Sequence, residues 1–546
     1  MILEHIEITG FRGISHLSLP LTSTNLLIGE NAWGKSSLLD ALTLLLSPQS
    51  TPYQFTAHDF HFPPGELEAQ MRRLRIVFCF RAGPDDHETA LASFWQQAED
   101  GGRLLYYSVQ GRRRDEGVFT SRRFLDARGE VLPEAGTAAA IQQLIRRSPV
   151  LRLRDARFSR RSRASDVALE PEVNSLATEA EALMRELMTR PQHLTDDMLR
   201  QGLQTLQQLL EHYFLVQPAD ASAPVARVAP QRRKGEAGWR SLDQLNQLIG
   251  ETDSRSHQLI LLRMFSLLLQ ARGSDALAPG SQPLLLIEDP ETRLHPIMLS
   301  VTWNLLEMLP LQKIATTNSS ELLSQVPVEH VCRLVREAER VTAWRIGPEG
   351  LSAEESRRIG FHIRVNRPSA LFARCWLLVE GETEVWIINE LARQRGYHFA
   401  AEGVKVIEFA QSGLRPLLKF ARRMGIAWHV LTDGDDAGKK YAASARGQLQ
   451  HGETEDDHLT QLPALDMENF LYRQGFSEVY REVAHLPSNV PMNARRIITK
   501  AIHHASKPEL AIAVAMSAAE RGPAAIPPLL NSLFARVMWL ARGKAD

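Results

Sequence analysis

Short apolar runs that end in acidic residues are the feature that most limits the fold of this 546-residue chain. Trp376 to Val379 leads into Glu380-Gly381-Glu382-Thr383-Glu384, and Ala427 to Leu431 leads into Asp433-Gly434-Asp435. Helix-forming stretches at 384–395 and 415–424 and an apolar run at 404–409 lie between the two motifs. This alternation predicts a parallel α/β sheet in which each acidic motif directly follows a strand.

The acidic residues of this region predict a metal site. The carboxylates concerned are Glu380, Glu384, Asp433, Asp435, Asp466 and Glu468. Residues four apart at the start of a helix, or alternating in an extended segment, place their side chains on one side. Packed carboxylates require a cation, and hard oxygen ligands suit Mg²⁺ or Mn²⁺. Six of them suit a two-metal site for in-line attack on a phosphodiester, and the alternative is a calcium-binding or salt-bridged surface cluster.

A phosphate-binding loop is predicted near the N-terminus. The segment Gly29-Glu30-Asn31-Ala32-Trp33-Gly34-Lys35-Ser36 follows an apolar strand at 25–28 and precedes a helix former at 38–46. In such a loop the glycines let backbone N–H groups approach phosphate oxygens, the lysine reaches the β and γ phosphates, and the serine hydroxyl binds Mg²⁺. The predicted nucleotide-binding residues here are Gly29, Asn31, Gly34, Lys35, Ser36 and Ser37.

A second apolar strand, 283–287, ends in Glu288 and Asp289. We expect Glu288 to complete the nucleotide-bound metal site and Asp289 to act in ATP hydrolysis. The alternative is a solvated turn at the end of the strand. That alternative does not explain two adjacent carboxylates after so apolar a strand, because burying an unpaired charge is costly.

The segment Glu288-Asp289-Pro290-Glu291, with Leu294-His295-Pro296, resembles the acidic strand end of ABC-type ATPases of recombination, repair and chromosome maintenance. The resemblance implies head dimers that enclose nucleotide between them. This chain has Glu-Asp where transporter-like members have Asp-Glu, and Asn318 stands where a switch histidine is usual. We therefore expect slow hydrolysis. A degenerate match to the family signature lies at Ser254-Arg255-Ser256-His257-Gln258.

The two acidic motifs after 376–379 and 427–431 resemble a Toprim metal site, and the whole chain resembles the OLD (overcoming lysogenization defect) family of ATP-dependent endonucleases, within it the YbjD-like group. The resemblance implies that the six carboxylates are metal ligands and that Glu380, Asp433 and Asp435 are catalytic. It also implies a basic residue that stabilises charge in phosphoryl transfer, for which Lys507 in Ser506-Lys507-Pro508 is the candidate. An exposed, solvated lysine is the alternative for Lys507.

The predicted fold class is α/β, with an N-terminal ABC-type P-loop ATPase domain that has a helical insertion and a C-terminal Toprim α/β domain that has a helical tail. The insertion corresponds to the dimerisation element of the family, and a plain pair of core helices is the alternative. The predicted boundaries are 1–166 and 217–345 for the ATPase, 167–216 for the insertion, 346–367 for a linker, 368–470 for the Toprim nuclease core and 471–546 for the helical C-terminal part.

A net charge of -1 predicts no general attraction to nucleic acid, so contact with DNA requires local patches. The arginines that form one candidate patch are Arg146, Arg147, Arg152, Arg154, Arg157, Arg160, Arg161 and Arg163, with Arg112, Arg113 and Arg114 nearby. The alternative is that these arginines pair with acids such as Asp155 and Glu170. Three cysteines, no targeting segment and no long apolar run predict a cytoplasmic protein without a membrane partner.

The sequence as a whole predicts an ATP-binding and ATP-hydrolysing, metal-dependent DNA endonuclease of phage defence or DNA repair. We expect a homodimer that uses ATP with one Mg²⁺ or Mn²⁺ and two such ions at the Toprim site. Two alternatives stay open, a nucleotide-gated DNA clamp or sensor with a residual nuclease site and a Toprim ribonuclease. A primase or topoisomerase is disfavoured, because the chain has neither a zinc cluster nor a tyrosine in a recognisable setting for strand passage.

Overall fold

The computed structural model describes residues 1–46, 52–62, 73–83, 89–133, 136–153, 281–292, 296–308, 311–347, 350–487 and 491–543. The predicted insertion at 167–216, the signature-like segment at 254–258 and the arginines between 154 and 163 lie outside these residues. The chain divides into two compact units, which we call the N-terminal unit (Met1–Leu27 and Gly34–Leu322) and the C-terminal unit (Ile28–Trp33 and Leu323–Asp546).

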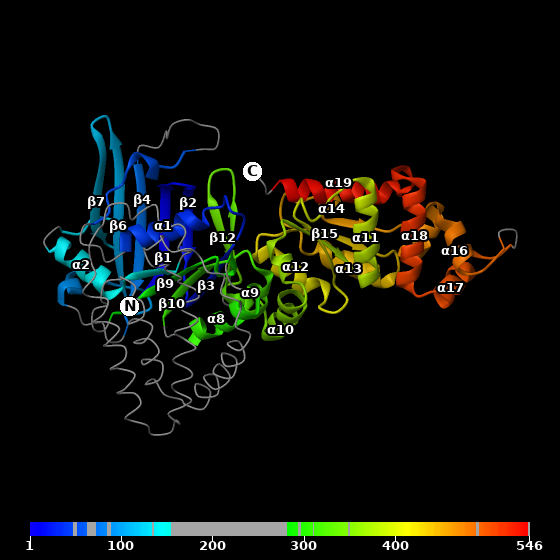
Figure 1. The fold of residues 1–546 in the computed structure, drawn as a ribbon, viewed down its shortest axis with the longest axis horizontal. Helices are drawn as coiled ribbons and strands as arrows, with labels where there is room; N and C mark the ends of the chain where they lie inside the picture. Colours follow the sequence, from blue (N-terminus) through cyan, green and yellow to red (C-terminus); the bar gives the residue numbers. More distant parts are fainter. Residues whose placement is uncertain are drawn as a thin grey trace, which may run out of the picture. The chain divides into compact units, whose positions relative to one another are not determined.

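An antiparallel sheet forms part of the N-terminal unit (Figure 1). Its order is β2-β1-β4-β6-β5, and β7 also pairs with β6. The strands are β1 (Ile2–Phe11), β2 (Ile14–Pro20), β4 (Arg73–Arg81), β5 (Gln96–Gln97), β6 (Arg103–Arg114) and β7 (Gly117–Leu125). Exposed and buried residues alternate at the start of β4, from Arg73 to Ile76. This alternation follows from the two-residue period of a strand, so one face of the sheet packs on the core and the other is polar.

Four parallel strands in the order β3-β10-β9-β8 carry the predicted nucleotide-binding motifs. They are β3 (Thr24–Ile28), β8 (Val150–Leu153), β9 (Leu284–Glu288) and β10 (Gln312–Thr316). The side chains of β9 before Glu288 are all buried, as expected for a parallel strand that is covered on both faces. The strand β3 runs directly into the glycine loop, and α1 (Lys35–Leu46) begins at the end of that loop. The N-terminal unit also contains α2 (Thr137–Arg147) and α8 (Pro296–Met308).

The C-terminal unit begins with the second half of α9 (Ser320–Gln325), the hairpin of β11 (Val331–Arg336) and β12 (Val341–Arg345), and α10 (Ala353–Ile359). The buried side chain of Arg333 in β11 donates to the backbone oxygens of Met424 at 3.1 Å, Gly425 at 2.7 Å and Ala373 at 2.9 Å. Burial lowers the pKa of Arg333 to about 10. These three hydrogen bonds fix the hairpin to the rest of the unit, because a buried guanidinium requires partners for its donors.

A four-stranded parallel sheet with the order β14-β13-β15-β16 follows in the C-terminal unit. Its strands are β13 (Cys375–Val379), β14 (Val404–Glu408), β15 (Ala427–Thr432) and β16 (Leu459–Gln461). The helices α11 (Glu382–Arg395) and α12 (Leu414–Arg423) cross between β13, β14 and β15, and α13 (Asp436–Arg446) follows β15. Strands and helices therefore alternate as the sequence predicts, and the predicted α/β fold class is confirmed.

The remainder of the C-terminal unit is mostly helical, also as predicted from the sequence. Its main helices are α15 (Met467–Leu471), α16 (Ser477–Val483), α17 (Ala494–His504), α18 (Lys507–Arg521) and α19 (Pro528–Arg542). Their apolar residues join those of β13 and α11 in one buried cluster, which includes Val514, Leu530 and Phe534. The helical tail is thus part of the same core as the C-terminal sheet.

The segment predicted as a linker, 346–367, contains α10 and a π-helical turn at Gly360–Val365. Ser352 caps α10 by accepting the N–H of Glu355, and Glu355 accepts the N–H of Ser352 in return. This reciprocal pair of hydrogen bonds satisfies two backbone donors at the start of the helix. Within the described part of the chain, no helix has both the length and the apolar character needed to span a membrane.

Candidate functional site

Two glycines of the glycine loop adopt a backbone conformation that other residues rarely adopt. Gly29 and Gly34 both have positive φ angles, 146° and 93°. A Cβ atom on Gly29 would lie 2.6 Å from the backbone oxygen of Leu334, so a larger residue does not fit there. Lys35, the first residue of α1, is 3% exposed. The loop therefore presents backbone N–H groups and a positive helix end, which suit the phosphates of a nucleotide.

The residues after β10 lie beside the lysine of this loop. Lys35 Nζ donates to Asn318 Oδ1 at 3.4 Å. Both Asn318 N and Thr317 Oγ1 donate to the carboxylate of Glu291, at 2.6 Å and 2.9 Å. Burial raises the pKa of Glu291, although these hydrogen bonds oppose the shift. Glu291 thus holds the loop after β10 so that the side-chain amide of Asn318 contacts the ammonium group of Lys35.

Asp289 has an unusual backbone conformation for a residue that is not glycine. Its φ is 40°, and Thr316 of the neighbouring strand β10 holds it. Asp289 N donates to Thr316 Oγ1 at 3.1 Å, and that hydroxyl donates to Asp289 Oδ1 at 2.8 Å. A positive φ costs energy outside glycine and is found most often where a side chain must be aimed. The role of Asp289 in hydrolysis stays a prediction, and the structure adds that Thr316 fixes the direction of its carboxylate.

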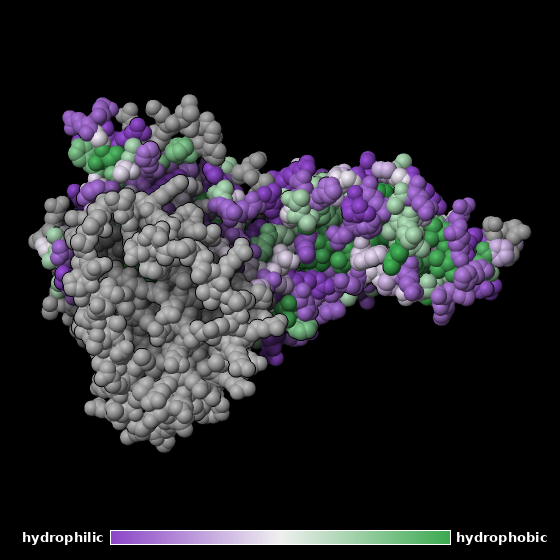
Figure 2. All heavy atoms as spheres, in the orientation of Figure 1, coloured by the Kyte–Doolittle hydropathy of each residue, from purple (hydrophilic) through white to green (hydrophobic). Residues whose placement is uncertain are grey.

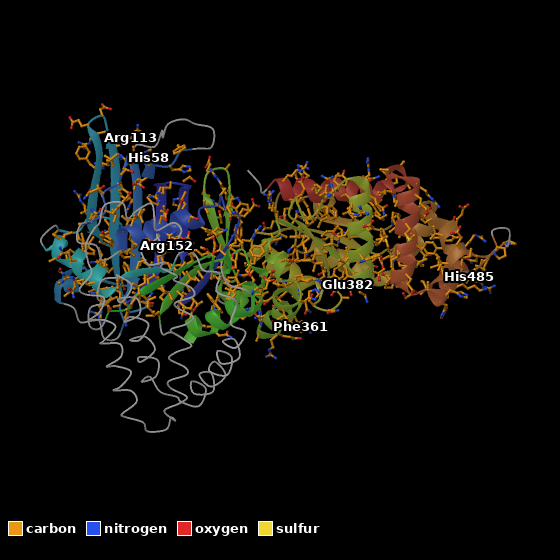
Figure 3. All side chains as sticks on the ribbon, in the orientation of Figure 1. His58, Arg113, Arg152, Phe361, Glu382 and His485 are labelled. Atoms are coloured by element: carbon orange, nitrogen blue, oxygen red, sulfur yellow. The ribbon has the colours of Figure 1, made fainter. Side chains whose placement is uncertain are left out.

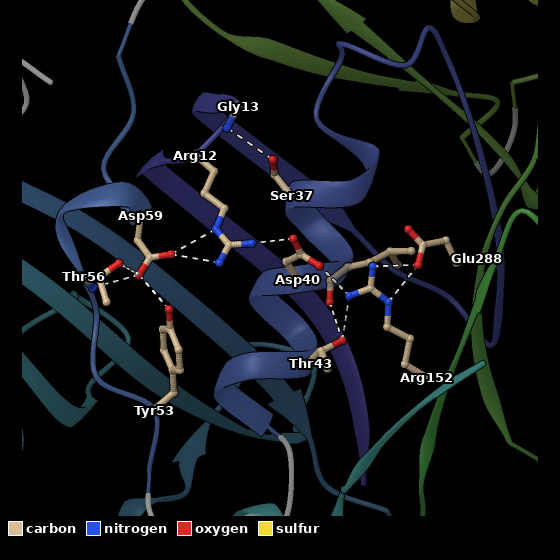
Figure 4. Close-up of polar contacts among 11 residues, drawn as sticks. Arg12, Gly13, Ser37, Asp40, Thr43, Tyr53, Thr56, Asp59, Arg152 and Glu288 are labelled. Carbon is tan, nitrogen blue, oxygen red and sulfur yellow. Dashed lines mark hydrogen bonds and ion pairs between the residues drawn. The ribbon is translucent and has the colours of Figure 1, made fainter. Parts of the chain in front are cut away.

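A chain of ion pairs connects Glu288 to the helix after the glycine loop (Figure 4). Arg152 Nη2 lies 2.8 Å from Glu288 Oε2, and Arg152 Nη1 lies 2.5 Å from Asp40 Oδ1 of α1. Arg12 lies 2.5 Å from the other oxygen of Asp40 and 3.0 Å from Asp59. From the sequence, Arg152 is part of a candidate patch of arginines that would bind DNA. The structure instead gives it two carboxylate partners and leaves 8% of its side chain exposed.

The other predicted nucleotide-binding residues differ in their surroundings. Asn31 and Ser36 are exposed on the loop and at the start of α1. The hydroxyl of Ser37 accepts the backbone N–H of Gly13 at 3.2 Å, which ties α1 to the turn between β1 and β2. When bound, ATP with Mg²⁺ would be held by the glycine loop, Lys35 and Ser36, and the adjoining carboxylates would complete its surroundings.

The second set of predicted residues lies at the carboxyl end of the C-terminal sheet. In the order β14-β13-β15-β16, the chain leaves β13 toward one side and β15 toward the other, which makes a topological switch point between these two strands. Ligands of open α/β sheets bind outside the carboxyl ends of strands at such a point. Glu380 follows β13, and Asp433 follows β15.

The carboxylates at this switch point act on one another electrostatically. Burial, which is the largest cause, and the negative charges of Glu380, Glu384, Asp466 and Glu468 together raise the pKa of Asp433 to about 8. Each of these groups is therefore close enough to disfavour a second negative charge at Asp433.

Burial also raises the pKa of Glu380, to which Asp435 and Glu384 contribute, while Lys507 opposes the shift. The Glu384 carboxylate accepts the N–H of Gly381 at 3.0 Å, and burial raises its pKa as well. The structure thus brings together all six carboxylates that the sequence singled out, because four of them act on Asp433 and Asp435 acts on Glu380.

Three of the six carboxylates also have structural tasks. Asp435 caps α13 by accepting the N–H of Gly438 at 2.7 Å, and Asp466 caps α15 by accepting the N–H of Asn469 at 2.7 Å. Glu468 pairs with Lys507, whose Nζ lies 2.8 Å from its Oε1. Although burial lowers it, this ion pair and the neighbouring carboxylates raise the pKa of Lys507. The predicted lysine therefore lies at the carboxylate cluster.

The donor atoms present fit hard divalent cations. Glu380 Oε2 and Glu468 Oε2 are buried and have no hydrogen-bond partner, which is costly unless a cation is bound. Among the described residues, no three His, Cys, Asp or Glu side chains already stand around one point as ligands. One or two divalent cations bound here would offset the negative charge of these carboxylates.

Sequence reasoning missed a buried polar group beside this cluster. His362 Nε2 lies 2.7 Å from the backbone oxygen of Glu408, the last residue of β14, and Arg367 lies 3.6 Å from the Glu408 carboxylate. Arg367 also pairs with Glu382 at 2.6 Å, inside the first acidic motif. Glu382 itself is exposed (Figure 3). No spacing rule indicates these partners, because they come from separate segments of the chain.

Comparisons with known proteins cover both units. Residues 1–370 match the family described as "Protein of unknown function (DUF2813)", and residues 371–435 match the "Overcoming lysogenization defect protein-like, TOPRIM domain" family. The uncharacterized protein YbjD of Escherichia coli (strain K12) is 58% identical over the full length of both chains. The C-terminal region of the Burkholderia pseudomallei OLD protein is 17% identical, with 31% of this chain and 99% of that one covered and a TM-score of 0.26. The SmcHead bound to the C-winged helix domain of ScpA is 12% identical, with 66% and 100% covered and a TM-score of 0.36.

Proposed function

The chain belongs to the DUF2813 family and carries an OLD-like Toprim domain, and from this premise we propose that it is an ATP-binding, metal-dependent DNA endonuclease. The observation that carries the proposal is the cluster of six carboxylates and Lys507 at the switch point of the C-terminal sheet. No pairing within the cluster cancels its negative charge, since Lys507 is one cation among six acids. Divalent cations bound there would activate water and stabilise the leaving oxygen of a phosphodiester.

Each part of the cluster has a task in this proposal. Glu380, Glu384, Asp433, Asp435, Asp466 and Glu468 hold one or two Mg²⁺ or Mn²⁺ ions. Lys507 would place its ammonium near the scissile phosphate and stabilise the charge that develops there. Lys35 and the glycine loop bind ATP, Glu288 and Ser36 serve its metal ion, and Asp289 acts in its hydrolysis. We further propose that the protein works as a homodimer in phage defence or DNA repair.

A nicking assay on supercoiled plasmid tests the nuclease. The variant Glu380→Gln/Asp433→Asn removes two charges from the cluster with little change of shape. We expect wild type to nick the plasmid with Mg²⁺ or Mn²⁺ and the variant to lose at least about a hundredfold in rate, which corresponds to about 3 kcal/mol. Metal titration of thermal unfolding gives a second readout, because bound cations raise the melting temperature of the wild type only.

A matched control comes from the same two motifs. Glu382 and Asp436 are 71% and 94% exposed, so Glu382→Gln/Asp436→Asn removes the same charge from the same turns. Loss of nicking in this control would show that charge near the motifs matters and that the cluster has no special role. Cleavage of RNA but not of plasmid by the wild type would replace DNA by RNA as the substrate.

Asn318 favours a second use of ATP. Its amide contacts Lys35 but cannot exchange a proton, in contrast to the histidine that is usual in related ATPases. Such a site binds ATP and hydrolyses it slowly, so ATP would act as a switch that gates a DNA clamp. Asn318→His should then speed hydrolysis, and an unchanged rate would speak against this reading.

A further inference from the structure

One face of the antiparallel sheet in the N-terminal unit carries arginines that neither candidate site uses. Residues directly opposite one another on paired antiparallel strands share a face. In this register Arg73 of β4 lies opposite Arg112 of β6, which lies opposite Phe119 of β7. The arginines placed on this face, which we call the arginine face, are Arg73, Arg75, Arg81, Arg112, Arg114 and Arg123.

The part of the arginine face near the β6–β7 turn has no neutralising partner among the residues that the structure describes. Arg73, Arg75 and Arg112 are exposed, and their side chains make no ion pair or hydrogen bond with any residue in the described ranges. Arg81, at the other end of the same face, bridges Glu4 and Asp100 at 2.9 Å each. Arginines of this sheet can therefore be paired, whereas these three have no such partner in the described ranges.

Direct opposition of Arg73 and Arg112 costs stability, because like charges facing each other across two strands repel. The described strands place Glu7, opposite Val77, on this face, and Glu4 of the same strand pairs with Arg81. Asp115 and Glu116 form the turn beyond Arg114, and neither forms an ion pair with a described arginine. An external polyanion would remove the repulsion by contacting several guanidinium groups at once.

The chemistry of the face indicates which polyanion it suits. A guanidinium group presents a planar fork of donors that matches two phosphate oxygens. The face also has an aromatic side chain, since Phe119 is 48% exposed and Arg114 lies over its ring at 5.5 Å. Exposed aromatic rings among arginines are typical of surfaces that bind nucleic-acid strands. Hydrophilic residues also cover the end of the β6–β7 hairpin in Figure 2, where Figure 3 places Arg113.

We propose that the arginine face binds the phosphate backbone of a nucleic acid. The proposal rests on the proposed nuclease function, because it names a surface of the N-terminal unit that holds the same substrate away from the metal site. Arg73, Arg75 and Arg112 contact phosphates, and Phe119 lies against a base or sugar. The residues of this face come from β4, β6 and β7, so the sheet register positions them without help from any loop.

Binding in the presence of EDTA tests this surface without cleavage. Fluorescence anisotropy is measured with a short DNA duplex and with its single strand over a range of salt concentrations, for wild type and for Arg73→Gln/Arg75→Gln/Arg112→Gln. We expect at least a tenfold loss of affinity at low salt and a decrease of about 2 to 3 in the slope of log K against log salt, since each lost phosphate contact removes about 0.7 to 0.9. Greater loss with the single strand would assign Phe119 to base stacking.

A second triple variant, Arg340→Gln/Arg358→Gln/Arg393→Gln, is the matched control. It removes the same charge from exposed arginines that pair with Glu337, Glu354 and Glu390. An equal loss of DNA affinity in both triple variants would overturn the proposal. So would a wild-type protein that binds neither the duplex nor the single strand, or one that binds phosphatidylglycerol vesicles more tightly than nucleic acid. Arg112→Gln alone should raise the melting temperature slightly, because it removes the repulsion from Arg73.

Failure of this proposal and failure of the nuclease proposal give different results. If the arginine face is wrong, the triple variant binds DNA as wild type does, and plasmid nicking still depends on Glu380 and Asp433. If the nuclease is wrong, wild type binds nucleic acid with the expected salt dependence and leaves the plasmid intact with every metal.

Discussion

Arg152 illustrates how the partners of one side chain decide its role. It joins Asp40 of α1 to Glu288 of β9, and 8% of its side chain is exposed (Figure 4). Arg152→Gln leaves two carboxylates without this partner in a partly buried setting. We expect a loss of about 2–4 kcal/mol in the free energy of unfolding and at least a tenfold slower ATP hydrolysis, with ATP affinity changed less. Denaturant unfolding and steady-state kinetics measure the two effects.

Arg81→Gln is the control for Arg152. Arg81 also bridges two carboxylates, but 33% of its side chain is exposed, and solvent screens exposed ion pairs, so we expect a smaller loss of stability. Equal destabilisation by both substitutions would mean that burial does not increase the contribution of the Arg152 ion pairs to the free energy of unfolding. An unchanged rate of ATP hydrolysis in Arg152→Gln would show that the ion pair with Arg152 is not required for the role of Glu288 in hydrolysis.

Lys313 of β10 gives a prediction about pH. It is 3% exposed, and burial lowers its pKa to about 8. Between pH 8 and the ordinary lysine value near 10.5, the unfolded chain keeps the proton that the folded chain has lost, so stability from this group rises with pH. Lys313→Met should therefore be more stable than wild type at pH 7 by about 1–3 kcal/mol, and the difference should shrink toward pH 10.5.

The free energy of unfolding is measured for wild type and for Lys313→Met at each pH. Subtracting one from the other removes the contribution of other groups that titrate at high pH. Lys405→Met, on the partly exposed strand position of β14, is the control. A stability difference between wild type and Lys313→Met that stays constant from pH 7 to 10.5 would show that Lys313 keeps its charge in the fold.

At the scale of elements, α13 depends on glycines at both of its ends, and the two differ in kind. A Cβ atom on Gly438 would lie 2.0 Å from the backbone oxygen of Asp433, whereas on Gly447 it would lie 3.5 Å from that of Ala443. Gly438→Ala must therefore push α13 away from the turn that carries Asp433 and Asp435. We expect a loss of about 2–3 kcal/mol in stability and loss of nicking.

Gly447→Ala is the matched control on the same helix. Its added methyl group meets ordinary van der Waals distances, and the unfolded chain loses some freedom, so stability should stay the same or rise by up to about 1 kcal/mol. Urea unfolding and the plasmid assay compare the variants. If Gly438→Ala were as active and stable as Gly447→Ala, close packing of α13 on the acidic turn would not be needed.

At the scale of the whole molecule, the lysine of the glycine loop and the carboxylate cluster fall in different compact units. Lys35 lies in the N-terminal unit and the carboxylate cluster in the C-terminal unit. We predict that Lys35→Ala abolishes ATP hydrolysis and leaves metal-dependent nicking measurable, because the metal chemistry needs no nucleotide. Conversely, Glu380→Gln/Asp433→Asn should lose nicking and keep hydrolysis within about threefold, a change under 1 kcal/mol.

Loss of both activities in Lys35→Ala, at an unchanged melting temperature, would contradict this separation. It would show a coupling free energy between the two units, and ATP affinity should then depend on DNA to the same extent that DNA affinity depends on ATP. Titration of ATP with and without DNA, in EDTA-free buffer for the Glu380→Gln/Asp433→Asn variant, measures that reciprocal effect.

The sequence alone determined the order of elements and the identity of the main chemical groups. Apolar runs followed by Glu380 and by Asp433 predicted strands that the structure places at 375–379 and 427–432. The glycine loop was predicted between a strand and a helix, and it lies between β3 and α1. These features depend on local periodicity and on turn residues, which a strand or helix displays in its own sequence.

Only the tertiary structure decided which charges meet. The pairing of Arg152 with Glu288, of Lys507 with Glu468 and of Arg367 with Glu408 joins residues separated by about forty to more than a hundred positions, and the strand register set Arg73 opposite Arg112. The sequence does not distinguish an arginine that pairs with a carboxylate of the same chain from one that is available to bind a ligand. Its Coulomb energy depends on distance and burial, and the packing of separate segments fixes both.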